Sequence, residues 1–288
     1  MVMDHSRKAI PDPLQIRLLQ SADLVHADRL RALAGWNQTR ADWVRFMEYE
    51  PSGCFLAEWE GQPVGTVTTT SYGSDLAWIG MMLVDPDYRR RGIASALMQQ
   101  AIAYLDNEGV KCIKLDATPE GMMVYEKLGF TAEWELHRWE ANPTGDASVA
   151  FARETFPDQI DWDAQIFGAR RLRWLGRLAD RSAIVSVAHD EVGKVTAFGM
   201  AREGMRANYI GPIVASDEAG GLLIAGKILR RIRGRSFWDL PDANTSAAEL
   251  AKDSGFRPVR HLIRMWRGKA NVSSQPLLQF GITDPAAG

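Results

Sequence analysis

Hydrophobic positions along the first half of the chain fall into short segments that predict alternating strands and helices. Ala77–Val84 is a nearly continuous apolar run, which is typical of a strand buried on both faces of a sheet. Phe55–Trp59 and Val64–Thr70 flank a short glycine-containing turn and predict a hairpin. Apolar residues at helical spacing predict a helix over Gly92–Leu105. Further strands are predicted over Leu14–Leu19, Val110–Ala117 and Phe130–Trp139, and further helices over Ser21–Ala34, Arg40–Glu48 and Thr118–Leu128.

A second series of strand and helix patterns begins after a linker. Residues Ala141–Ala147 are rich in Pro, Gly and small polar side chains, as is typical of a join between domains. Beyond it, helices are predicted over Trp162–Phe167, Arg171–Leu178, Gly221–Ile232 and Thr245–Ser254, and strands over Ala183–Ala188, Val195–Ala201, Asn208–Val214, Phe237–Leu240 and Pro258–Trp266. A chain of 288 residues can form two domains that each bury a core. We therefore predict an α/β protein with domains at residues 1–141 and 148–288.

Short matches between the two halves indicate a diverged internal repeat. Ile79–Val84 (IGMMLV) parallels Ile210–Val214 (IGPIV), and Val124–Phe130 (VYEKLGF) parallels Leu250–Phe256 (LAKDSGF). Each half then ends in a predicted strand that carries an arginine and a tryptophan. The sequence thus predicts that the second domain repeats the fold of the first.

Composition and charge exclude several classes of partner. The net charge is −2, so the chain has no overall basic field that would attract nucleic acid or an anionic membrane. No apolar run approaches the roughly 18–20 residues of a membrane span, and the N-terminal segment lacks the apolar core of a signal peptide. Cys54 and Cys112 have no CxxC partner, and the histidines show no metal-ligand spacing. We expect a cytoplasmic protein with two buried reduced thiols and no bound metal.

A basic loop follows the most apolar predicted strand and leads into a helix. Pro86 ends the strand, because proline cannot donate to a sheet, and three arginines precede Gly92. The first amides of a helix have no partner within it and lie at the positive end of its dipole, so they can bind a pyrophosphate. Arg89–Arg91 would add charged hydrogen bonds to phosphate oxygens. The alternative is a solvated basic loop, but the R-x-x-G-x-A spacing between strand and helix favours an anion site.

The loop resembles the signature of the GNAT superfamily of N-acetyltransferases, Gln/Arg-x-x-Gly-x-Gly/Ala, at Arg89, Gly92 and Ala94. Ala94 stands where glycine is commoner. The resemblance covers about Leu14–Trp139 and implies two domains, the second degenerate, each with a mixed, mostly antiparallel sheet flanked by helices. It also implies that acetyl-CoA binds to the first domain. By this resemblance, the pyrophosphate would be held by Arg89, Arg90, Arg91, Gly92, Ile93, Ala94 and Ser95, and the pantetheine arm by the backbone of Met82, Leu83 and Val84.

Tyr125 is the candidate catalytic residue. Thr118 can cap its helix at the N-terminus, and Gly129 suits the left-handed position that ends a helix. Gly121 lies one turn before Tyr125 on the same face and leaves space beside the ring. A phenol with a pKa near ~10 stays protonated at neutral pH and can protonate a departing thiolate. From the residues alone, a structural role in which Tyr125 holds the helix to the sheet is favoured; the resemblance favours the acid role.

Candidates on the acceptor side rest on weaker signals. Trp36, Asn37 and Trp43 lie in an aromatic-rich link between the first two predicted helices, a region that the resemblance places beside the acceptor. A role in the core is the alternative. Asp116 ends the strand before the Tyr125 helix and is a candidate general base, although a structural role is favoured.

The second half lacks the features that would bind coenzyme A in the first half. After Val214, acidic residues stand where the first half has arginines, and Ala251 stands at the position of Tyr125. We therefore expect this domain to be a scaffold or a wall of the acceptor pocket.

These observations predict an enzyme that transfers an acetyl group from acetyl-CoA to a primary amine by direct attack in a ternary complex. The amine is a small molecule or the end of a peptide, and no metal takes part. An acyl-CoA-binding regulator or sensor without turnover is the alternative from another class. A longer acyl donor, such as succinyl- or malonyl-CoA, also remains open.

Overall fold

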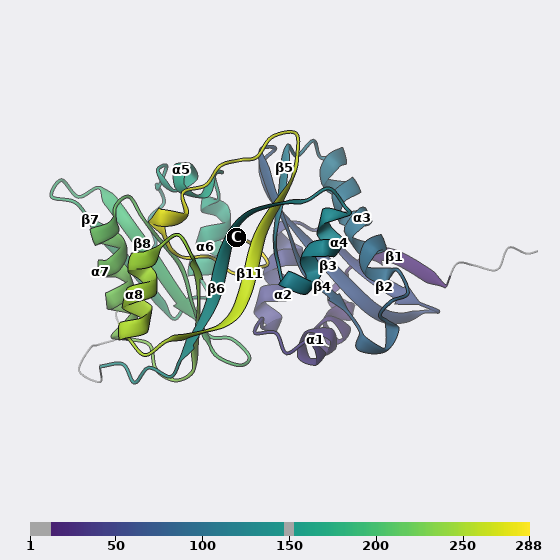
Figure 1. Cartoon of the computed structure of the whole chain (residues 1–288), viewed down its shortest axis with the longest axis horizontal. Helices are drawn as coiled ribbons and strands as arrows, with labels where there is room; N and C mark the ends of the chain where they lie inside the picture. The colour runs from purple at the N-terminus through teal and green to yellow at the C-terminus, as the bar shows by residue number, and fades with distance from the viewer. Residues whose placement is uncertain (1–12, 147–152) are drawn as a thin grey trace, which may run out of the picture.

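The computed structural model describes residues 13–146 and 153–288 (Figure 1). The N-terminal half contains a series of strands and helices that the apolar pattern predicts to within a few residues. Its strands are β1 (Leu14–Leu18), β2 (Cys54–Trp59), β3 (Gln62–Tyr72), β4 (Leu76–Val84), β5 (Cys112–Ala117) and β6 (Thr131–Ala141). Its helices are α1 (Leu24–Leu33), α2 (Arg40–Tyr49), α3 (Ile93–Asn107) and α4 (Pro119–Glu126), with 3-10 turns at Ser21–Asp23 and Pro86–Tyr88.

The C-terminal half repeats this alternation. Its helices are α5 (Asp163–Phe167), α6 (Leu172–Ala179), α7 (Glu218–Leu229) and α8 (Thr245–Asp253), and its strands are β7 (Ile184–His189), β8 (Val195–Arg202), β9 (Asn208–Ala215), β10 (Ser236–Pro241), β11 (Arg257–Gly268) and β12 (Gln279–Gly281). The 3-10 turn Pro276–Leu278 and the strand β12 have no counterpart in the sequence prediction, which ends at Trp266.

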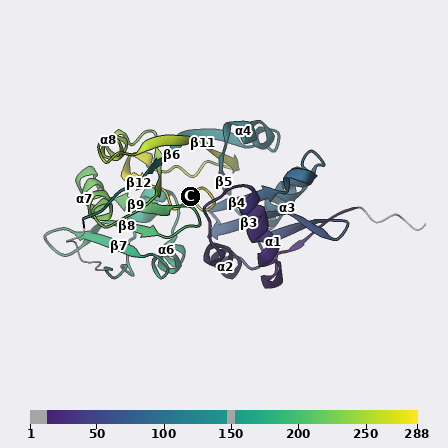
Figure 2. The same ribbon diagram turned by 90° about the horizontal axis from the view of Figure 1, so that it is seen from below.

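In the part of the chain that the structure describes, the strands of both halves join in one sheet of twelve strands. Eleven of them follow the order β1-β2-β3-β4-β5-β11-β6-β10-β9-β8-β7, and β12 pairs with β9. Most neighbours are antiparallel; β4 with β5 and β9 with β10 are parallel. The sheet is thus mixed and mostly antiparallel, and helices cover both of its faces, as predicted (Figure 2).

The two halves exchange their last strands. β11 lies between β5 and β6 and pairs antiparallel with both, although β11 belongs to the C-terminal half. β6 in turn pairs with β10 of that half. The two long strands cross the middle of the molecule in Figure 1. The sequence boundary at residues 141 and 148 stays a prediction, because residues 147–152 lie outside the described part, but the sheet itself does not divide there.

Hydrophobic cores lie on both faces of the sheet. On one face, α1 and α2 share a core with the C-terminal half, in which Trp43, Trp78, Phe167 and Trp174 are buried together. On the other face, α3 packs on β2, β3 and β4, and α7 packs on β7, β8 and β9. Cys54 and Cys112 are buried free thiols, and burial raises the pKa of Cys54 to about 12. Within the described residues, no helix is long and apolar enough to span a membrane.

The internal repeat is visible in how α4 and α8 end. Gly129 and Gly255 both have left-handed backbones, with φ of 85° and 80°. The amide of Phe130 donates to the carbonyl of Tyr125 at 3.1 Å, and the amide of Phe256 donates to the carbonyl of Ala251 at 2.9 Å. This is the hydrogen-bond pattern of a glycine-terminated helix. Tyr125 and Ala251 therefore occupy equivalent places in the two halves, as the sequence alignment predicts.

The segment after β12, residues 282–288, lies against strands of both halves. Gly80 and Gly211, which are equivalent in the repeat, each lie against its backbone: a Cβ atom would come within 2.3 Å of the Ala286 carbonyl at Gly80 and within 2.1 Å of the Ile282 carbonyl at Gly211. Only glycine permits this approach. The glycine of each repeated Ile-Gly pair is thus the point at which β4 or β9 contacts the segment after β12.

Candidate active site

The strands β4 and β5 separate shortly after they begin to pair. They are bonded in parallel only over Leu76–Trp78, opposite Cys112–Lys114. Met81 has a positive φ of 48°, beside an irregularity in the pairing of β3 with β4. Beyond this point the edge of β4 that faces β5, including Met82–Val84, is not paired with β5. The split leaves backbone groups of β4 available to a ligand that enters between the strands.

The basic loop turns sharply between β4 and α3. Arg90 and Gly92 have positive φ values of 61° and 81°, and Gly92 is the N-cap of α3. Within the described residues, the amides of residues 92–95 donate no hydrogen bond to other backbone atoms, whereas the next amide, that of Ala96, donates to Gly92. These free donors fit an anion at the N-terminus of a 15-residue helix.

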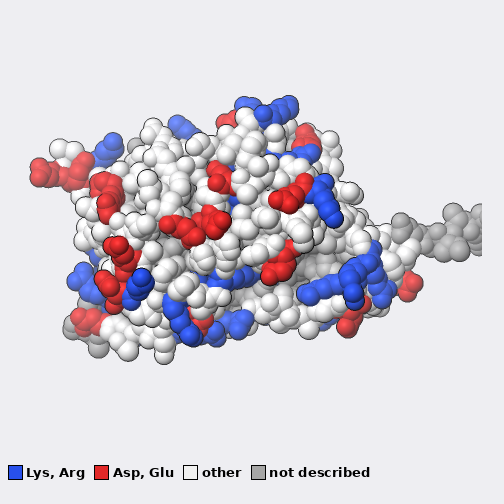
Figure 3. Space-filling model, in the orientation of Figure 1, with Lys and Arg blue, Asp and Glu red and all other residues white. Residues whose placement is uncertain are grey.

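The three arginines of the loop differ in their surroundings. Arg89 and Arg90 are exposed, and no hydrogen bond or ion pair joins their side chains to the described residues. Arg91 lies over the rings of Trp59 and Tyr88, at 5.2 and 5.1 Å. On the face seen in Figure 3, basic and acidic side chains are mixed, with one compact basic group on the N-terminal half.

Tyr125 lies on α4 with its ring toward the split. Thr118 caps this helix by accepting a hydrogen bond from the amide of Gly121 at 3.2 Å. A Cβ at Gly121 would lie 3.2 Å from the Tyr125 ring, so glycine leaves room for the ring beside the helix. The ring contacts Phe130 edge to face, with centroids 6.1 Å apart. Burial raises the pKa of the phenol above its usual 10, so the hydroxyl stays protonated.

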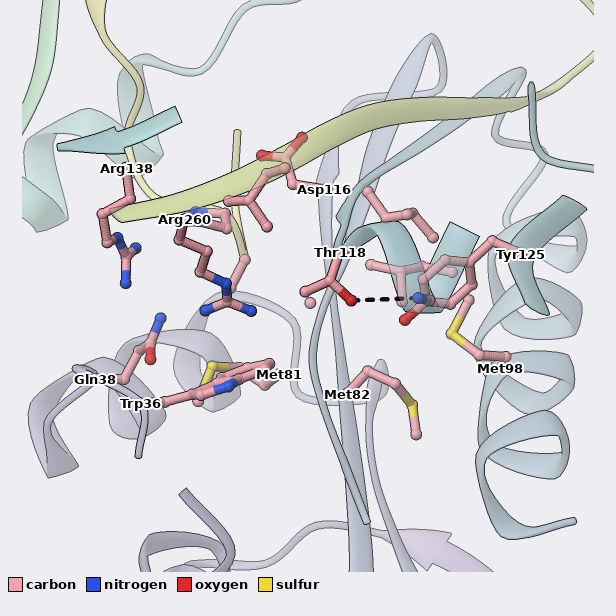
Figure 4. A pocket seen from close by; sticks show the side chains of 17 residues that line it. Trp36, Gln38, Met81, Met82, Met98, Asp116, Thr118, Tyr125, Arg138 and Arg260 are labelled. Carbon is pink, nitrogen blue, oxygen red and sulfur yellow. Dashed lines mark hydrogen bonds between the residues drawn. The ribbon is translucent and has the colours of Figure 1, made fainter. Parts of the chain in front are cut away.

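A cavity of about 190 Å³ connects Tyr125 with the split strands. Its lining comes from β4, β5, α3, α4, β6, β11, the loop before α2 and the segment after β12 (Figure 4). The lining residues are Trp36, Gln38, Ile79, Gly80, Met81, Met82, Met98, Leu115, Asp116, Thr118, Gly121, Tyr125, Arg138, Arg260, Leu262, Pro285 and Ala286. Both halves of the chain therefore build one site.

Asp116 reaches the cavity wall but is engaged with an arginine of β11. Its two oxygens accept hydrogen bonds from Nε and Nη2 of Arg264 at 2.8 and 2.9 Å, and both side chains are buried. Arg264 also lies over the rings of Trp78 and Trp134. Burial raises the pKa of the Asp116 carboxyl and Arg264 opposes that effect, but both oxygens already accept hydrogen bonds and neither is free to take a proton from an amine. The structure thus favours the structural role for Asp116.

The three acceptor-side candidates from the first link occupy different places. Trp36 lines the cavity. Asn37 does not: its side chain bonds the amides of Arg206 and Ala207 and the carbonyl of Ala207 at 2.9 to 3.0 Å. Trp43 is fully buried in the core beside α1 and also does not line the cavity. Asn37 therefore joins the halves and Trp43 fills the core, because an aromatic-rich pattern does not indicate which side of a helix faces a ligand.

Sequence reasoning missed both arginines of the cavity and the residues contributed by the last segment. Arg138 and Arg260 lie on the exchanged strands β6 and β11. The one indication of them in the sequence is that the last predicted strand of each half contains arginine. Pro285 and Ala286 come from a segment with no helix or strand pattern.

The equivalent split in the C-terminal half is filled by the chain itself. β9 and β10 pair in parallel only over Asn208–Ile210, as β4 and β5 do over three residues. β12 then pairs with β9, and the indole nitrogen of Trp238 on β10 donates to the carbonyl of Phe280 at 2.8 Å. The Phe280 ring lies against Gly221 near the start of α7. At that helix start, Asp217 accepts the amide of Gly220 at 2.7 Å.

Comparisons with known proteins agree with this tandem architecture. The model of the acetyltransferase (GNAT) family matches residues 22–130, and that of an acetyltransferase (GNAT) domain matches residues 160–281. The chain is 26% identical to the uncharacterised N-acetyltransferase YitH of Bacillus subtilis, over 79% of this chain and 82% of that protein. It is 24% identical to the holothin acyltransferase of a Pseudoalteromonas species, over 81% of each.

Solved structures share the fold over nearly the whole chain. A protein of Pyrococcus horikoshii, 23% identical, superposes with a TM-score of 0.79 over 99% of both chains. A tandem GNAT protein from the clavulanic acid biosynthesis pathway, 14% identical, superposes with a TM-score of 0.60 over 90% of this chain and all of that one. With a GNAT model matched in each half, the chain belongs to the GNAT family of acetyltransferases and is a tandem, two-domain acyltransferase.

Proposed function

We propose that the protein transfers an acetyl group from acetyl-CoA to a primary amine, by direct attack within a ternary complex in the cytoplasm. The observation that carries the proposal is the convergence of the β4–β5 split and Tyr125 on one cavity. A donor that enters along the open edge of β4 would present its thioester beside the phenol. The amine would approach from the remaining part of the cavity.

The residues that would hold the donor are those of β4 and the basic loop. The free amides at the start of α3 and the exposed guanidinium groups of Arg89 and Arg90 suit a diphosphate. The unpaired edge of Met82–Val84 suits the amide groups of a pantetheine arm, which would extend the sheet in place of β5. Ile93 is buried and fixes the helix start against the core.

Tyr125 would supply the proton that acetyl transfer needs. The amine nitrogen forms a bond to the carbonyl carbon, the carbon–sulfur bond breaks, and the thiolate takes a proton from the Tyr125 hydroxyl. Thr118 and Gly121 keep the ring in place. Because Asp116 is held by Arg264, removal of the amine proton by water is the simpler route. Donor chain length stays open, since the cavity wall is built of flexible methionines as well as rigid segments.

The proposal is tested by incubating the protein with acetyl-CoA and a broad panel of amines. Turnover is measured as the release of the free thiol of coenzyme A. Saturable coenzyme A binding without turnover on any amine would favour the alternative, an acyl-CoA sensor. Propionyl-, succinyl- and malonyl-CoA in the same assay would report the preferred acyl chain.

The donor site has its own test in the loop. Arg89→Ala with Arg90→Ala should weaken coenzyme A binding about tenfold or more, because charged hydrogen bonds to phosphate are lost. The matched control is Arg230→Ala with Arg257→Ala, which removes the same charge from exposed sites of the other half. Equal affinity in both double variants would remove the loop from the donor site.

A further inference from the structure

The cavity has two chemically different ends. In Figure 4, Tyr125, Thr118, Met82 and Met98 lie at one end, whereas Arg138, Arg260 and Gln38 lie at the other, with Trp36 below them. The first end would receive the thioester. The second end is built from β6, β11 and the loop before α2, so it faces whatever the acceptor carries beyond its amine.

Charges along the wall of the cavity are balanced except at one residue. Arg138 donates to both oxygens of Asp239 at 2.8 and 2.7 Å, and Asp239 also accepts the hydroxyl of Tyr209 at 2.8 Å. The pair of Asp116 and Arg264 is likewise complete. Arg260 is the exception: its side chain has no hydrogen bond or ion pair with residues 13–146 or 153–288.

The surroundings of Arg260 make this positive charge costly. Burial and the positive charge of Arg138 lower the pKa of its guanidinium, while the negative charges of Asp239 and Glu120 oppose that effect. An arginine nevertheless stays charged at neutral pH. A partly buried charge without a hydrogen-bonded partner is expensive, and an anion in the cavity would remove this cost.

A second polar group at the same end lacks a partner. The side-chain oxygen of Gln38 is buried and accepts no hydrogen bond from the described residues. Gln38 lines the cavity near Arg260 (Figure 4). Buried polar atoms are almost always paired in folded proteins. Because this oxygen has almost no accessible surface, it can bond a ligand only after the Gln38 side chain turns toward the cavity, whereas Arg260 can bond an anion directly.

We propose that Arg260 binds a carboxylate of the acceptor, so that the substrates are amines that carry a carboxylate, such as amino acids. This inference rests on the proposed acetyl transfer. A guanidinium presents two parallel N–H donors that match the two oxygens of a carboxylate. One unpaired guanidinium balances a single negative charge, whereas a phosphate dianion would leave one charge uncompensated among apolar walls. The remaining lining, rich in methionine with Trp36 and Leu262, suits an apolar side chain.

Matched pairs of amines test the inference by kinetics. Methionine and phenylalanine are compared with methioninamide and phenylalaninamide, which keep the side chain and remove the charge. Rates are corrected for the fraction of neutral amine. The wild type should prefer each acid by about 10- to 100-fold in kcat/KM, the range for a hydrogen bond to a charged group. The Arg260→Met variant should lose this preference through a higher KM for the acids, so that each acid and its amide are used with similar kcat/KM.

Two further variants test whether the loss of acid preference is specific to the charge of Arg260. Arg260→Lys keeps the charge and should retain part of the preference for acids. Arg257→Met, three residues earlier on the same strand and exposed, should behave as the wild type. Thermal melts of each variant report whether it folds.

Equilibrium binding decides the inference independently of turnover. Protein saturated with coenzyme A is titrated calorimetrically with the same acids and amides. Tighter binding of the acids to the wild type than to Arg260→Met supports the carboxylate site. Equal binding of acid and amide to the wild type overturns it. No turnover on any amine would sink the acetyl-transfer proposal alone, whereas turnover without a preference for acids would sink only the carboxylate site.

Discussion

At the scale of single residues, the role of Tyr125 is decided by its hydroxyl. Tyr125→Phe keeps the edge-to-face contact with Phe130 and the fit against Gly121, so the fold should be unchanged. The chemical rate should fall about 10²-fold or more, the usual effect of removing an acid catalyst, while coenzyme A affinity stays the same. Single-turnover kinetics and calorimetry measure the two quantities. A variant as fast as the wild type would exclude the phenol from the mechanism.

The pKa of the same hydroxyl predicts the alkaline behaviour of the enzyme. The protonated phenol is the active form, and burial raises its pKa above 10. Activity should therefore rise with pH as the amine loses its proton, and should not fall from loss of the phenol proton below about pH 10. A pH–rate profile of kcat at saturating amine measures this. A decline between pH 8 and 9 would indicate that another group donates the proton.

The positions of site residues that belong to a sequence motif could be predicted, whereas the positions of residues that depend on tertiary packing could not. The basic loop and Tyr125 have fixed spacing within one strand–loop–helix unit, so local sequence indicates their place. Trp43 and Trp36 look alike in sequence, yet one lies in the core and the other in the cavity. Arg260 reaches the site only because β11 inserts beside β5, a pairing across roughly half of the chain that no local pattern encodes.

At the scale of elements, apolar periodicity predicts nearly every strand and helix of the first 266 residues, because each buries one face in a core. β12 is only three residues long and has no periodicity to detect. Its position depends instead on the split between β9 and β10. The sequence indicates the position of the last segment only through Gly80 and Gly211, because both glycines lie in close contact with its backbone.

The filled split predicts how many donors one chain binds. Phe280 and the backbone of β12 occupy the place in the C-terminal half that corresponds to the open edge of β4. The Asp217 carboxylate at the start of α7 also repels a diphosphate. Calorimetry should therefore give one coenzyme A per chain. In the Arg89→Ala/Arg90→Ala double variant the same single site should weaken. A stoichiometry of two would show that the C-terminal half binds a donor as well.

At the scale of the whole molecule, the exchanged strands make the halves depend on each other. β5 and β6 are joined through β11, and Asp116 is paired with Arg264 from that strand. Asn37 further joins the halves through three hydrogen bonds. Without β11, the N-terminal half would expose two strand edges and bury an unpaired carboxylate. The two GNAT domains should therefore unfold as one unit rather than in two steps.

Arg264→Met tests this coupling. The substitution leaves Asp116 buried without its partner and should lower the free energy of unfolding by about 3–5 kcal/mol, the usual cost of breaking a buried ion pair. Since β11 contacts both halves, hydrogen exchange should become faster in β4 and β10 alike. Val192→Ser, at a turn where the side chain is 88% exposed, is the control and should leave both unchanged. Faster exchange confined to the C-terminal half would mean that the domains open separately. In that case β11 would be a tether between independent domains and not a shared structural element.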